Sequence, residues 1–506
     1  MHSMPIMRAA GSLLALLMLA MTSPASAAPW AAPGDPRLRH SLQSLVDQGC
    51  LEVPVTSWPV MWTDIHRRLY DRDVSPECRN TTAWRYLRFE HERQTRPGFS
   101  GGVRLEGASD EPVFRDFSGG AREKAAAGAR VEWLADGVAL GLDVQQTRDP
   151  RDGDRTRLDG SYVAGALGNW VFGFGKVDRW WGPGWHSSDI LSTNARPVPA
   201  FWLNRRSTAA SEWPLLRWLG PWQFTVIAGE LEAERAVPDT RLLGARLSFR
   251  PVDGLEIGMS RTAQWAGEGR PDSSRSLRKC LVGDSNHPVG DGEDQDACGQ
   301  MAGFDLRWSF LTEPGFTPAF YAQAIGEDEA GMLPSNYMAL AGLELGTALG
   351  GQEQRFFLEY TDNIAGTWPS EQRPNVAFEN GSYPTGYRYR GRNMASTWET
   401  DARAGTFGAS HFTADGREIG VSIIHAALNR DGTLRSSEAR GLMLEPVDVQ
   451  RLNIMQLRYR QPLPRGRITL SGWFKDHEIE SLEHEEETRQ LPRTTVMATW
   501  EYRFAL

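Results

Sequence analysis

Tryptophan and cationic side chains are concentrated in one stretch of this chain, residues 176–222. The stretch holds seven of the chain's 19 tryptophans. Up to residue 217 it also holds six Lys or Arg side chains against three acids, although the whole chain has a formal net charge of -9. A flat indole can stack on the C–H face of a sugar ring, and arginine pairs with carboxylates through two parallel hydrogen bonds. This Trp-rich segment is therefore a candidate site for an acidic carbohydrate.

The candidate binding residues lie around a turn that a regular strand cannot cross. Gly182, Pro183 and Gly184 interrupt the segment, because proline has no N–H for strand pairing and glycine weakens a strand. The tryptophans beside this turn are therefore poorly explained as ordinary strand residues. The candidate polysaccharide-binding side chains are Arg179, Trp180, Trp181, Trp185, Arg196, Trp202, Arg205 and Arg206.

The adjacent residues His186, Ser187, Ser188 and Asp189 contain the side-chain types of a catalytic triad. A triad needs its nucleophile, base and acid to converge from separate elements, which sequence neighbours rarely do. The GxSxG nucleophile motif is absent as well. A glycosidase needs two carboxylates about 5 to 9.5 Å apart, and nothing marks such a pair among the 64 acidic residues. We therefore expect no catalytic residues and no enzymatic activity.

Two acidic clusters do not match known metal-binding motifs. The loop 284–298 holds four acids within residues 291–296 but lacks the spacing and terminal glutamate of an EF-hand. The run 477–487 lacks the HExxH spacing of zinc proteases. Both are typical of solvated external loops, so we predict no metal site and no cofactor.

The N-terminus predicts export. Residues 1–28 have the layout of a signal peptide: Arg8, an apolar run from Leu13 to Met21, and the small residues Ala25 to Ala27 before the cleavage point. An exported protein meets an oxidising compartment, where cysteines pair.

The four cysteines allow three connectivities. Pairing between sequence neighbours is favoured, which gives Cys50 with Cys78 and Cys280 with Cys298. No two cysteines have CxxC spacing, so neither a zinc site nor a redox motif is indicated.

Residues 29–96 are predicted to form a small helical bundle. Asp35 and Pro36 supply an N-cap and a proline at the first helical position, and leucines follow at helical spacing. Further helices are expected near Trp62 and Trp84. The bundle is too small to be a large independent domain.

From residue 97 to the end, the hydrophobic period switches to two. After the signal there is no run of 18 apolar residues, which excludes a helical membrane protein. A transmembrane β-barrel is allowed, because its strands alternate lipid-facing and lumen-facing side chains. In the last strand, one face carries Val496, Ala498, Trp500, Tyr502, Phe504 and Leu506.

Similar alternating segments recur along the chain. With the last strand and two weaker candidates near 111–119 and 437–445, they give about 18 strands, an even number as such barrels require. The fold class predicted is an all-β transmembrane antiparallel β-barrel with a small N-terminal α-helical bundle. The other predicted strands lie near 99–107, 127–135, 138–147, 158–166, 169–177, 222–231, 240–250, 254–264, 303–311, 317–325, 336–345, 354–362, 418–428, 452–461 and 466–477.

Short turns and long polar loops alternate in the C-terminal half, as in barrels with short periplasmic turns and long external loops. Counting strands back from the C-terminus puts an insert at residues 178–221 in the lumen or on the periplasmic side. Counting forward from the turn 135–137 puts it outside. We favour the first count, because the alternation of loop lengths is the stronger signal. In the lumen, the insert could plug the barrel, contact sugar, or do both.

Tryptophans beside predicted strands are expected in the aromatic girdles at the two membrane interfaces. These are Trp133, Trp170, Trp308, Trp473 and Trp500.

The motif WWGPGW-x-SSDILS-x-NARP-x-P, residues 180–199, resembles the signature of the Wzi family of outer-membrane capsule-assembly proteins. The specific part of the likeness covers residues 169–206, while the helical start, the barrel pattern and the chain length also fit. Leu506 departs from the phenylalanine usual at the end of outer-membrane barrels. The resemblance implies an 18-stranded barrel with a helical bundle at its periplasmic end. It also implies a lectin-like role without catalysis.

The leading functional hypothesis is a non-catalytic outer-membrane lectin that anchors or organises capsular polysaccharide at the cell surface. The alternative is an outer-membrane porin or a polysaccharide export channel, although so many indoles do not suit an open aqueous lumen. A periplasmic glycan-active enzyme is the third class considered. Expected partners are capsular or other acidic surface polysaccharide and outer-membrane lipid. Nucleic acid is not expected, because the chain is acidic and has no extended basic stripe, and we expect a monomer.

Overall fold

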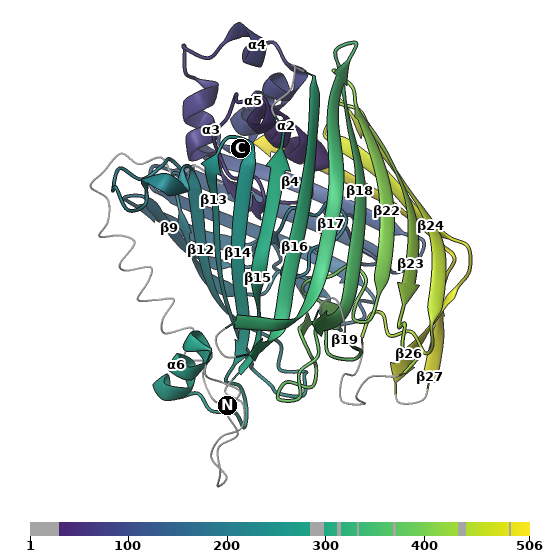
Figure 1. Ribbon diagram of the computed structural model, residues 1–506. Coiled ribbons are helices and arrows are strands. Elements are labelled where there is room, and N and C mark those ends of the chain that lie inside the picture. The colour runs from purple at the N-terminus through teal and green to yellow at the C-terminus, as the bar shows by residue number, and fades with distance from the viewer. Residues whose placement is uncertain are drawn as a thin grey trace.

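The computed structural model describes residues 30–283, 298–310, 315–330, 333–367, 371–433, 442–484 and 487–506. Within these residues, 18 antiparallel strands close into a barrel, with helices at one end (Figure 1). The predicted fold class is therefore confirmed. The predicted signal peptide and the acidic loop 284–297 lie outside the described residues.

Each barrel strand pairs with its neighbours along the chain, and the last strand pairs with the first to close the ring. Two short strands, β7 (Thr156–Arg157) and β19 (Glu371–Arg373), pair with β6 and β18. The barrel strands are β4 (Gly98–Ala108), β5 (Ala125–Ala135), β6 (Val138–Arg148), β8 (Tyr162–Leu167), β9 (Trp170–Gly175), β11 (Ala200–Arg205), β12 (Trp222–Glu230), β13 (Arg241–Val252), β14 (Leu255–Trp265), β15 (Cys298–Ser309), β16 (Phe316–Ala330), β17 (Leu333–Leu349), β18 (Gln352–Thr367), β22 (Arg403–Phe412), β23 (Glu418–Leu428), β24 (Gln450–Pro462), β25 (Arg467–Lys475) and β28 (Thr494–Ala505).

The strands carry apolar side chains outside and many polar side chains inside. In β24, Met455, Leu457 and Tyr459 are exposed, whereas Gln456 and Arg458 between them are buried. In a soluble protein the arrangement is reversed, with apolar side chains buried and polar side chains exposed. The arrangement in β24 is the alternation expected of a strand that separates lipid from a polar lumen.

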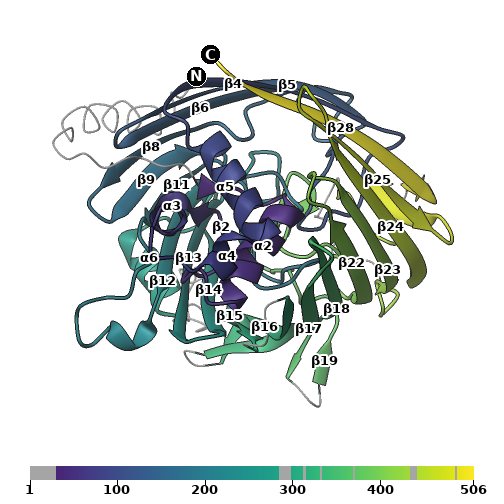
Figure 2. The same cartoon turned by 90° about the horizontal axis from the view of Figure 1, so that it is seen from above.

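Four helices lie over one mouth of the barrel, and Figure 2 shows them within the outline of the ring. We call this mouth the helical end and the opposite mouth the loop end. The helices are α2 (Pro36–Asp47), α3 (Trp62–Leu69), α4 (Pro76–Arg79) and α5 (Thr82–Gln94). A fifth, α6 (Ser274–Val282), belongs to a connection at the loop end. None of the helices in the described part of the chain has the length and apolar composition needed to cross a bilayer.

Helix α2 is buried along its whole length, although seven of its 12 residues are polar. It begins as predicted, with Pro36 first and the Asp35 carboxylate accepting the Leu38 N–H at 3.1 Å. Its polar groups pair with the barrel wall: Arg307 donates to the Asp47 carboxylate at 2.6 Å, and Arg460 donates to Asp35 at 2.8 Å. Removing one partner of such a buried pair costs about 3–5 kcal/mol. These pairs therefore hold α2 in the barrel mouth.

Both predicted disulfides are present. Cys50–Cys78 joins the segment after α2 to α4, and Cys280–Cys298 joins α6 to the first residue of β15. Two further pairs of short strands lie apart from the wall. β1 (Trp30–Ala31) pairs with β3 (Val60–Met61), and β2 (Ser57–Trp58) pairs with β10 (Trp180–Trp181).

The predicted strand number is right, but two of its members are wrong. Residues 111–119 form no strand, and neither do residues 442–445, the described part of the other weak candidate. The missed strands are β11 and β22. β11 lies inside the Trp-rich segment and has only six residues, with Phe201 and Trp202 on opposite faces, so it lacks a polar face. β22 contains few large apolar residues and resembles a loop.

Residues 178–221 do not form the single insert that was predicted. The end of the barrel at which each strand begins follows from chain order and pairing. Three residues separate α5 from β4, so Gly98 lies at the helical end, and so does its partner Leu134. Further along the chain, Trp170 of β9 pairs with Arg205 of β11. β9 therefore runs from the helical end to the loop end, and β11 runs back. Residues 176–199, which connect them, start and finish at the loop end. Only residues 206–221 lie at the helical end, so β11 divides the predicted insert in two.

Candidate functional site

Residues 176–199, the lumenal segment, fill the centre of the barrel. Every residue from Arg179 to Val198 is buried. The segment contacts inward-facing side chains of several strands and one side of α2. Its shape is fixed by four sets of contacts, and together these explain most of the WWGPGW motif.

The first contact is a carboxylate on the wall that binds three successive backbone amides. The N–H groups of Trp185, His186 and Ser187 donate to Glu359 of β18 at 2.6, 3.1 and 2.9 Å. The Tyr321 hydroxyl donates to the same carboxylate at 2.9 Å. Hydrogen bonds to an ionised acceptor are about twice as strong as neutral ones. Glu359 therefore holds the turn against the wall.

The second contact joins the turn to the helices. Arg39 of α2 donates to the carbonyl oxygens of Pro183 and Gly184 at 2.5 and 2.8 Å. Its guanidinium lies 4.2 Å from the centre of the Trp185 ring, a cation–π distance. The Trp185 Nε1 donates to Glu344 of β17 at 2.7 Å. Trp185 thus connects the helical bundle to the wall.

The third contact explains the paired tryptophans and the first glycine. Trp180 and Trp181 form β10 and pair with Trp58 and Ser57 of β2. Gly182 has a φ of +135° and faces the Gln323 amide so closely that an added Cβ would lie 2.6 Å from it. Only glycine fits there without strain. The motif is therefore required by packing in this fold.

The fourth contact joins the lumenal segment to a second connection from the loop end, residues 374–402. The His186 ring stacks on Trp398 with centroids 5.1 Å apart. The Thr397 hydroxyl donates to the His186 carbonyl at 2.8 Å, and Asn194 donates to the carbonyl of Ser396 at 3.1 Å. The two connections interlock, so both close the lumen together.

Trp473 belongs to this interior rather than to a girdle. It is buried, and its ring centroid lies 5.6 Å from that of His186. The girdle prediction for Trp473 is therefore wrong, because its position on β25 faces the lumen. Trp308, in contrast, is exposed on the outer face beside Phe310 and Phe320.

The candidate arginines already have protein partners. Arg196 donates to Asp159 and to Asp152 at 2.7 Å each, which ties the lumenal segment to the loop before β8. Arg179 donates to the Val177 carbonyl at 2.8 Å, and burial lowers the pKa of Arg179 to about 10.

Arg205 and Arg206 are at the helical end, away from Arg179 and Arg196. The Arg205 guanidinium lies 3.8 Å from the centre of the Trp222 ring. Trp202 faces inward from β11 and packs edge-on against Trp30 at 5.0 Å. The structure therefore buries Trp180, Trp181 and Trp185 in three different hydrophobic clusters around the lumenal segment, and it places Trp202, Arg205 and Arg206 outside that segment.

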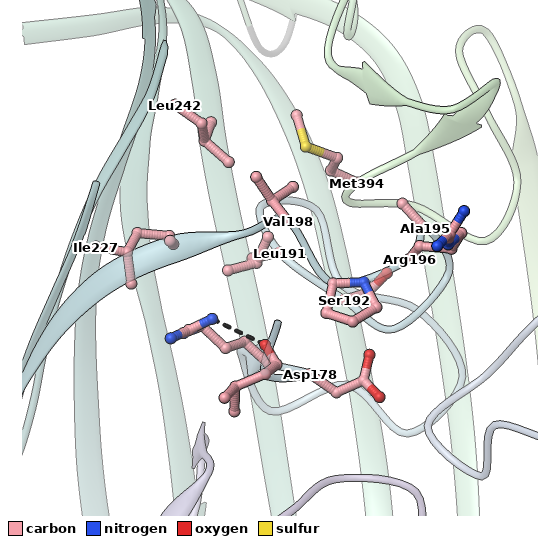
Figure 3. A pocket seen from close by; sticks show the side chains of 13 residues that line it. Asp178, Leu191, Ser192, Ala195, Arg196, Val198, Ile227, Leu242 and Met394 are labelled. Carbon is pink, nitrogen blue, oxygen red and sulfur yellow. Dashed lines mark hydrogen bonds between the residues drawn. The ribbon is translucent and has the colours of Figure 1, made fainter. Parts of the chain in front are cut away.

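A small cavity of about 30 Å³ separates the lumenal segment from the wall (Figure 3). It brings Leu191 and Val198 of the segment next to Ile227 and Leu242 of the wall. This volume suits about one water molecule, so the site does not admit a sugar.

The triad-like residues point to separate partners. The Ser188 hydroxyl donates to the Trp181 carbonyl at 2.6 Å, and the Ser187 hydroxyl lies 3.2 Å from that of Ser396. Asp189 is buried, which raises its pKa well above the usual value, and the Glu359 charge adds to that shift. Among the described residues, no group of three or more His, Cys, Asp or Glu side chains could hold a metal ion.

Sequence reasoning missed a polar cavity of about 270 Å³ between the lumenal segment and strands β4, β5, β6 and β28. Ten arginines and eight acidic residues line it. They come from strands, from α5 and from the connections between strands, so no local motif marks them. Only the folded barrel brings them together.

A closed ring of strands with an apolar outer face and its own connections inside the lumen defines a β-barrel of the outer-membrane type. The family model of capsule assembly protein Wzi matches residues 93–491. The chain therefore belongs to the Wzi capsule-assembly family and is an outer-membrane β-barrel.

Two relatives support this assignment. A protein of Klebsiella pneumoniae, described as an uncharacterized 55.8 kDa protein in the cps region, is 31% identical over 339 residues. The aligned part covers 65% of this chain and 64% of that protein's length. The structure of Wzi from Escherichia coli is 25% identical and superposes with a TM-score of 0.79, covering 94% of this chain and all of the other. That protein is described as a carbohydrate-binding β-barrel involved in group 1 capsule assembly.

Proposed function

We propose that this protein is a non-catalytic lectin that anchors or organises capsular or similar acidic polysaccharide at the cell surface. Family membership supports the link to capsule, and the carbohydrate binding described for the E. coli relative supports the lectin role. One observation carries the proposal: the lumenal segment is buried from Arg179 to Val198 and bonded to the wall and helices. A filled lumen suits a binding surface better than a conduit.

In this proposal, the loop end faces outward and the helical end faces the periplasm. The connections from β12 to β13, from β18 to β22 and from β23 to β24 all start and finish at the loop end, whereas the two-residue turns 136–137 and 350–351 are at the helical end. Long external loops and short periplasmic turns support this orientation. The protein acts as a monomer among outer-membrane lipids, with many weak contacts along a polymer giving avidity.

The Trp-rich motif has a supporting role in this proposal. Trp180 and Trp181 are almost wholly buried, so polymer reaches them only if the segment moves. They hold the connections that present the loop-end surface, and removing them weakens retention indirectly. Arg196 acts in the same way, through its bonds to Asp152 and Asp159.

The test is capsule retention on cells that lack the chain and carry variants in its place. Trp180→Ala, Trp181→Ala and Arg205→Ala are compared with Trp213→Ala, an exposed tryptophan of the same Trp-rich segment. Loss of cell-attached polysaccharide is expected in the null strain and in the two buried-tryptophan variants, with retention in Trp213→Ala. Heat-modifiable mobility on gels checks that each barrel is folded. Full retention in the null strain would contradict the proposal.

A channel is the second candidate, and the polar cavity beside β4–β6 is the observation that favours it. Single-channel recording separates the two functions. A porin gives a large ohmic conductance, whereas the closed lectin gives almost none.

A further inference from the structure

A second cavity opens at the helical end, between α5 and the barrel wall. It has a volume of about 250 Å³, roughly the space of eight water molecules. Arg93 and Arg96 line it from α5 and the residues after it, and Arg130 of β5 and Arg503 of β28 line it from the wall. Phe89 lies at its border. We call these five residues the arginine cleft.

The arginine cleft meets the larger inner cavity. Arg93, Arg130, Glu132 and Arg503 line both spaces. Another arginine of the inner cavity, Arg157, forms ion pairs with Glu123 at 2.6 Å and with Asp152 at 2.9 Å. The shared residues make the cleft at the helical end and the inner cavity neighbouring spaces.

The cleft has more positive charge than its acids neutralise. Among the described residues, Arg503 has neither an ion-pair partner nor a hydrogen bond, and the residue is exposed. Its electrostatic neighbours are the like charges of Arg93 and Arg130 and the opposite charges of two carboxylates, Glu132 and Glu501. Two of the arginines are already paired: Arg93 contacts Glu90 at 2.5 Å, and Arg130 contacts an acid at 2.7 Å. Arg96 and Arg503 are the two lining arginines without such a partner among the described residues, and Arg503 also lines the inner cavity.

Among the described residues, no acid forms a direct ion pair with Arg503, although Glu132 and Glu501 attract it from a distance. Glu92 lines the cleft but accepts from Arg88 at 2.9 Å, outside the lining. Glu132 accepts from Arg130 at 2.7 Å and from the Tyr162 hydroxyl at 2.5 Å. Each carboxylate is therefore engaged by another donor. An anion entering the cleft would relieve the repulsion among the arginines.

The side-chain types select the anion. A planar guanidinium with free donors matches a carboxylate in a two-bond geometry. Phe89 is 59% exposed on α5 beside these arginines, and an exposed aromatic ring offers a face to the C–H groups of a sugar. A carboxylate donor set next to an aromatic face is the combination that an acidic sugar uses.

We propose that the arginine cleft binds a uronate residue of an acidic oligosaccharide, with Arg503 pairing to its carboxylate and Phe89 packing on its ring. The inference rests on the proposed function for the source of the sugar. It adds a contact at the opposite end of the barrel from the loop surface.

The experiment uses the full chain in detergent and titration calorimetry with three probes: a galacturonate trimer, a neutral maltotriose and inorganic phosphate. The galacturonate trimer binds and maltotriose does not. Arg503→Gln weakens the uronate affinity about tenfold or more, as expected for a lost charge-assisted pair. Arg503→Lys, which keeps the positive charge but lacks the two parallel N–H donors of a guanidinium, has an intermediate uronate affinity. Arg465→Gln, an exposed arginine in a helical-end turn outside the cleft, binds like the unaltered protein.

Phe89→Ala separates a sugar site from a bare anion site. It weakens binding of the uronate trimer but leaves phosphate unaffected. The proposal is overturned if Arg503→Gln binds uronate with native affinity. It is also overturned if phosphate binds as tightly as uronate and Phe89→Ala changes neither.

Capsule retention distinguishes this failure from failure of the proposed function. If cells lacking the chain keep their capsule while the purified protein still binds uronate through Arg503, the surface role fails and the cleft stands. If the null strain loses its capsule while Arg503→Gln has no effect on uronate binding, the surface role stands and the cleft fails.

Discussion

The guanidinium of Arg39 lies 4.2 Å from the centre of the Trp185 ring. The first residue belongs to a helix at the barrel mouth, and the second belongs to a segment that enters from the opposite end. Arg39 also donates to two carbonyl oxygens of the turn before Trp185. The helices and the lumenal segment therefore meet inside the barrel and stabilise one another.

Replacing Arg39 tests this coupling. In Arg39→Met, two buried carbonyl groups lose their donors and the cation–π contact is lost, so the free energy of unfolding falls by about 2–4 kcal/mol. The measurement is denaturant unfolding of the full chain in detergent, followed by tryptophan fluorescence. Arg67→Met, at a largely exposed arginine of α3, changes stability by about 0.5 kcal/mol or less. Equal unfolding curves for the two variants would show that the contact does not stabilise the fold.

Glu359→Gln tests whether the carboxylate keeps the lumen closed. An amide offers one acceptor oxygen where the carboxylate accepts from three backbone N–H groups and Tyr321. The turn at Trp185 loosens, and brief current openings replace the quiet baseline in planar bilayers. Glu212→Gln, at an exposed glutamate of the helical end, keeps the quiet baseline. A Glu359→Gln recording without openings would show that this carboxylate is not needed to keep the lumen closed.

Acid should weaken the helical bundle through His91. Burial and then the nearby His66 lower the pKa of His91 from 6.5 to about 4. The folded state thus holds neutral His91 where the unfolded chain would already bind a proton. The stabilisation is complete above pH 6.5 and is lost as the pH falls from 6.5 toward 4. We expect the thermal midpoint of the bundle, followed by circular dichroism, to drop across that window.

The matched variants for the acid prediction are His91→Gln and His477→Gln. His91→Gln shows a shallower decline between pH 6.5 and 4, because the buried titrating group is gone. His477 is an exposed histidine near the loop end, and His477→Gln retains the full decline. If both variants decline alike, another group governs the acid response.

The barrel could be predicted from sequence because its signal is repeated. Residues such as Leu457 and Tyr459 alternate with polar neighbours over long strands, and each strand repeats the same physical constraint of lipid outside and polar lumen inside. The disulfides followed from separation and compartment. β11 was missed because its apolar residues Phe201 and Trp202 occupy both faces of a short strand.

The interior could not be predicted in the same way. The hydrogen bond from the Trp185 N–H to Glu359 joins residues 174 positions apart, and no spacing in the chain predicts such a contact. The arginine cleft likewise depends on which strand ends meet, and Arg503 on β28 gave no motif of its own. The Trp-rich motif was recognised as special, but sequence alone left both plugging and sugar contact open.

The buried carboxyl group of Asp189 makes the stability of the protein depend on pH. Its carboxyl group is buried, both oxygens lack a hydrogen-bond partner among the described residues, and Glu359 and Asp362 add repulsion, so its pKa is well above 3.8. The folded state therefore favours the protonated group. Because the folded state binds this proton more tightly than the unfolded state does, the contribution of Asp189 to stability is greatest below pH 3.8. It falls as the pH rises from there toward the folded pKa.

Asp189→Asn removes the charge without changing the shape. At pH 7.5, we expect the free energy of unfolding to rise by about 1–3 kcal/mol, because the unaltered protein must bury a group that prefers to ionise in water. Near pH 3 the gain shrinks toward zero, since the unfolded carboxyl, with a pKa of 3.8, is then largely protonated too. Denaturant unfolding at both pH values measures the difference, with Asp253→Asn, at an exposed aspartate in a helical-end turn, as the control. A gain of equal size at both pH values would mean that side-chain packing, and not the buried charge, limits the stability of the lumenal segment.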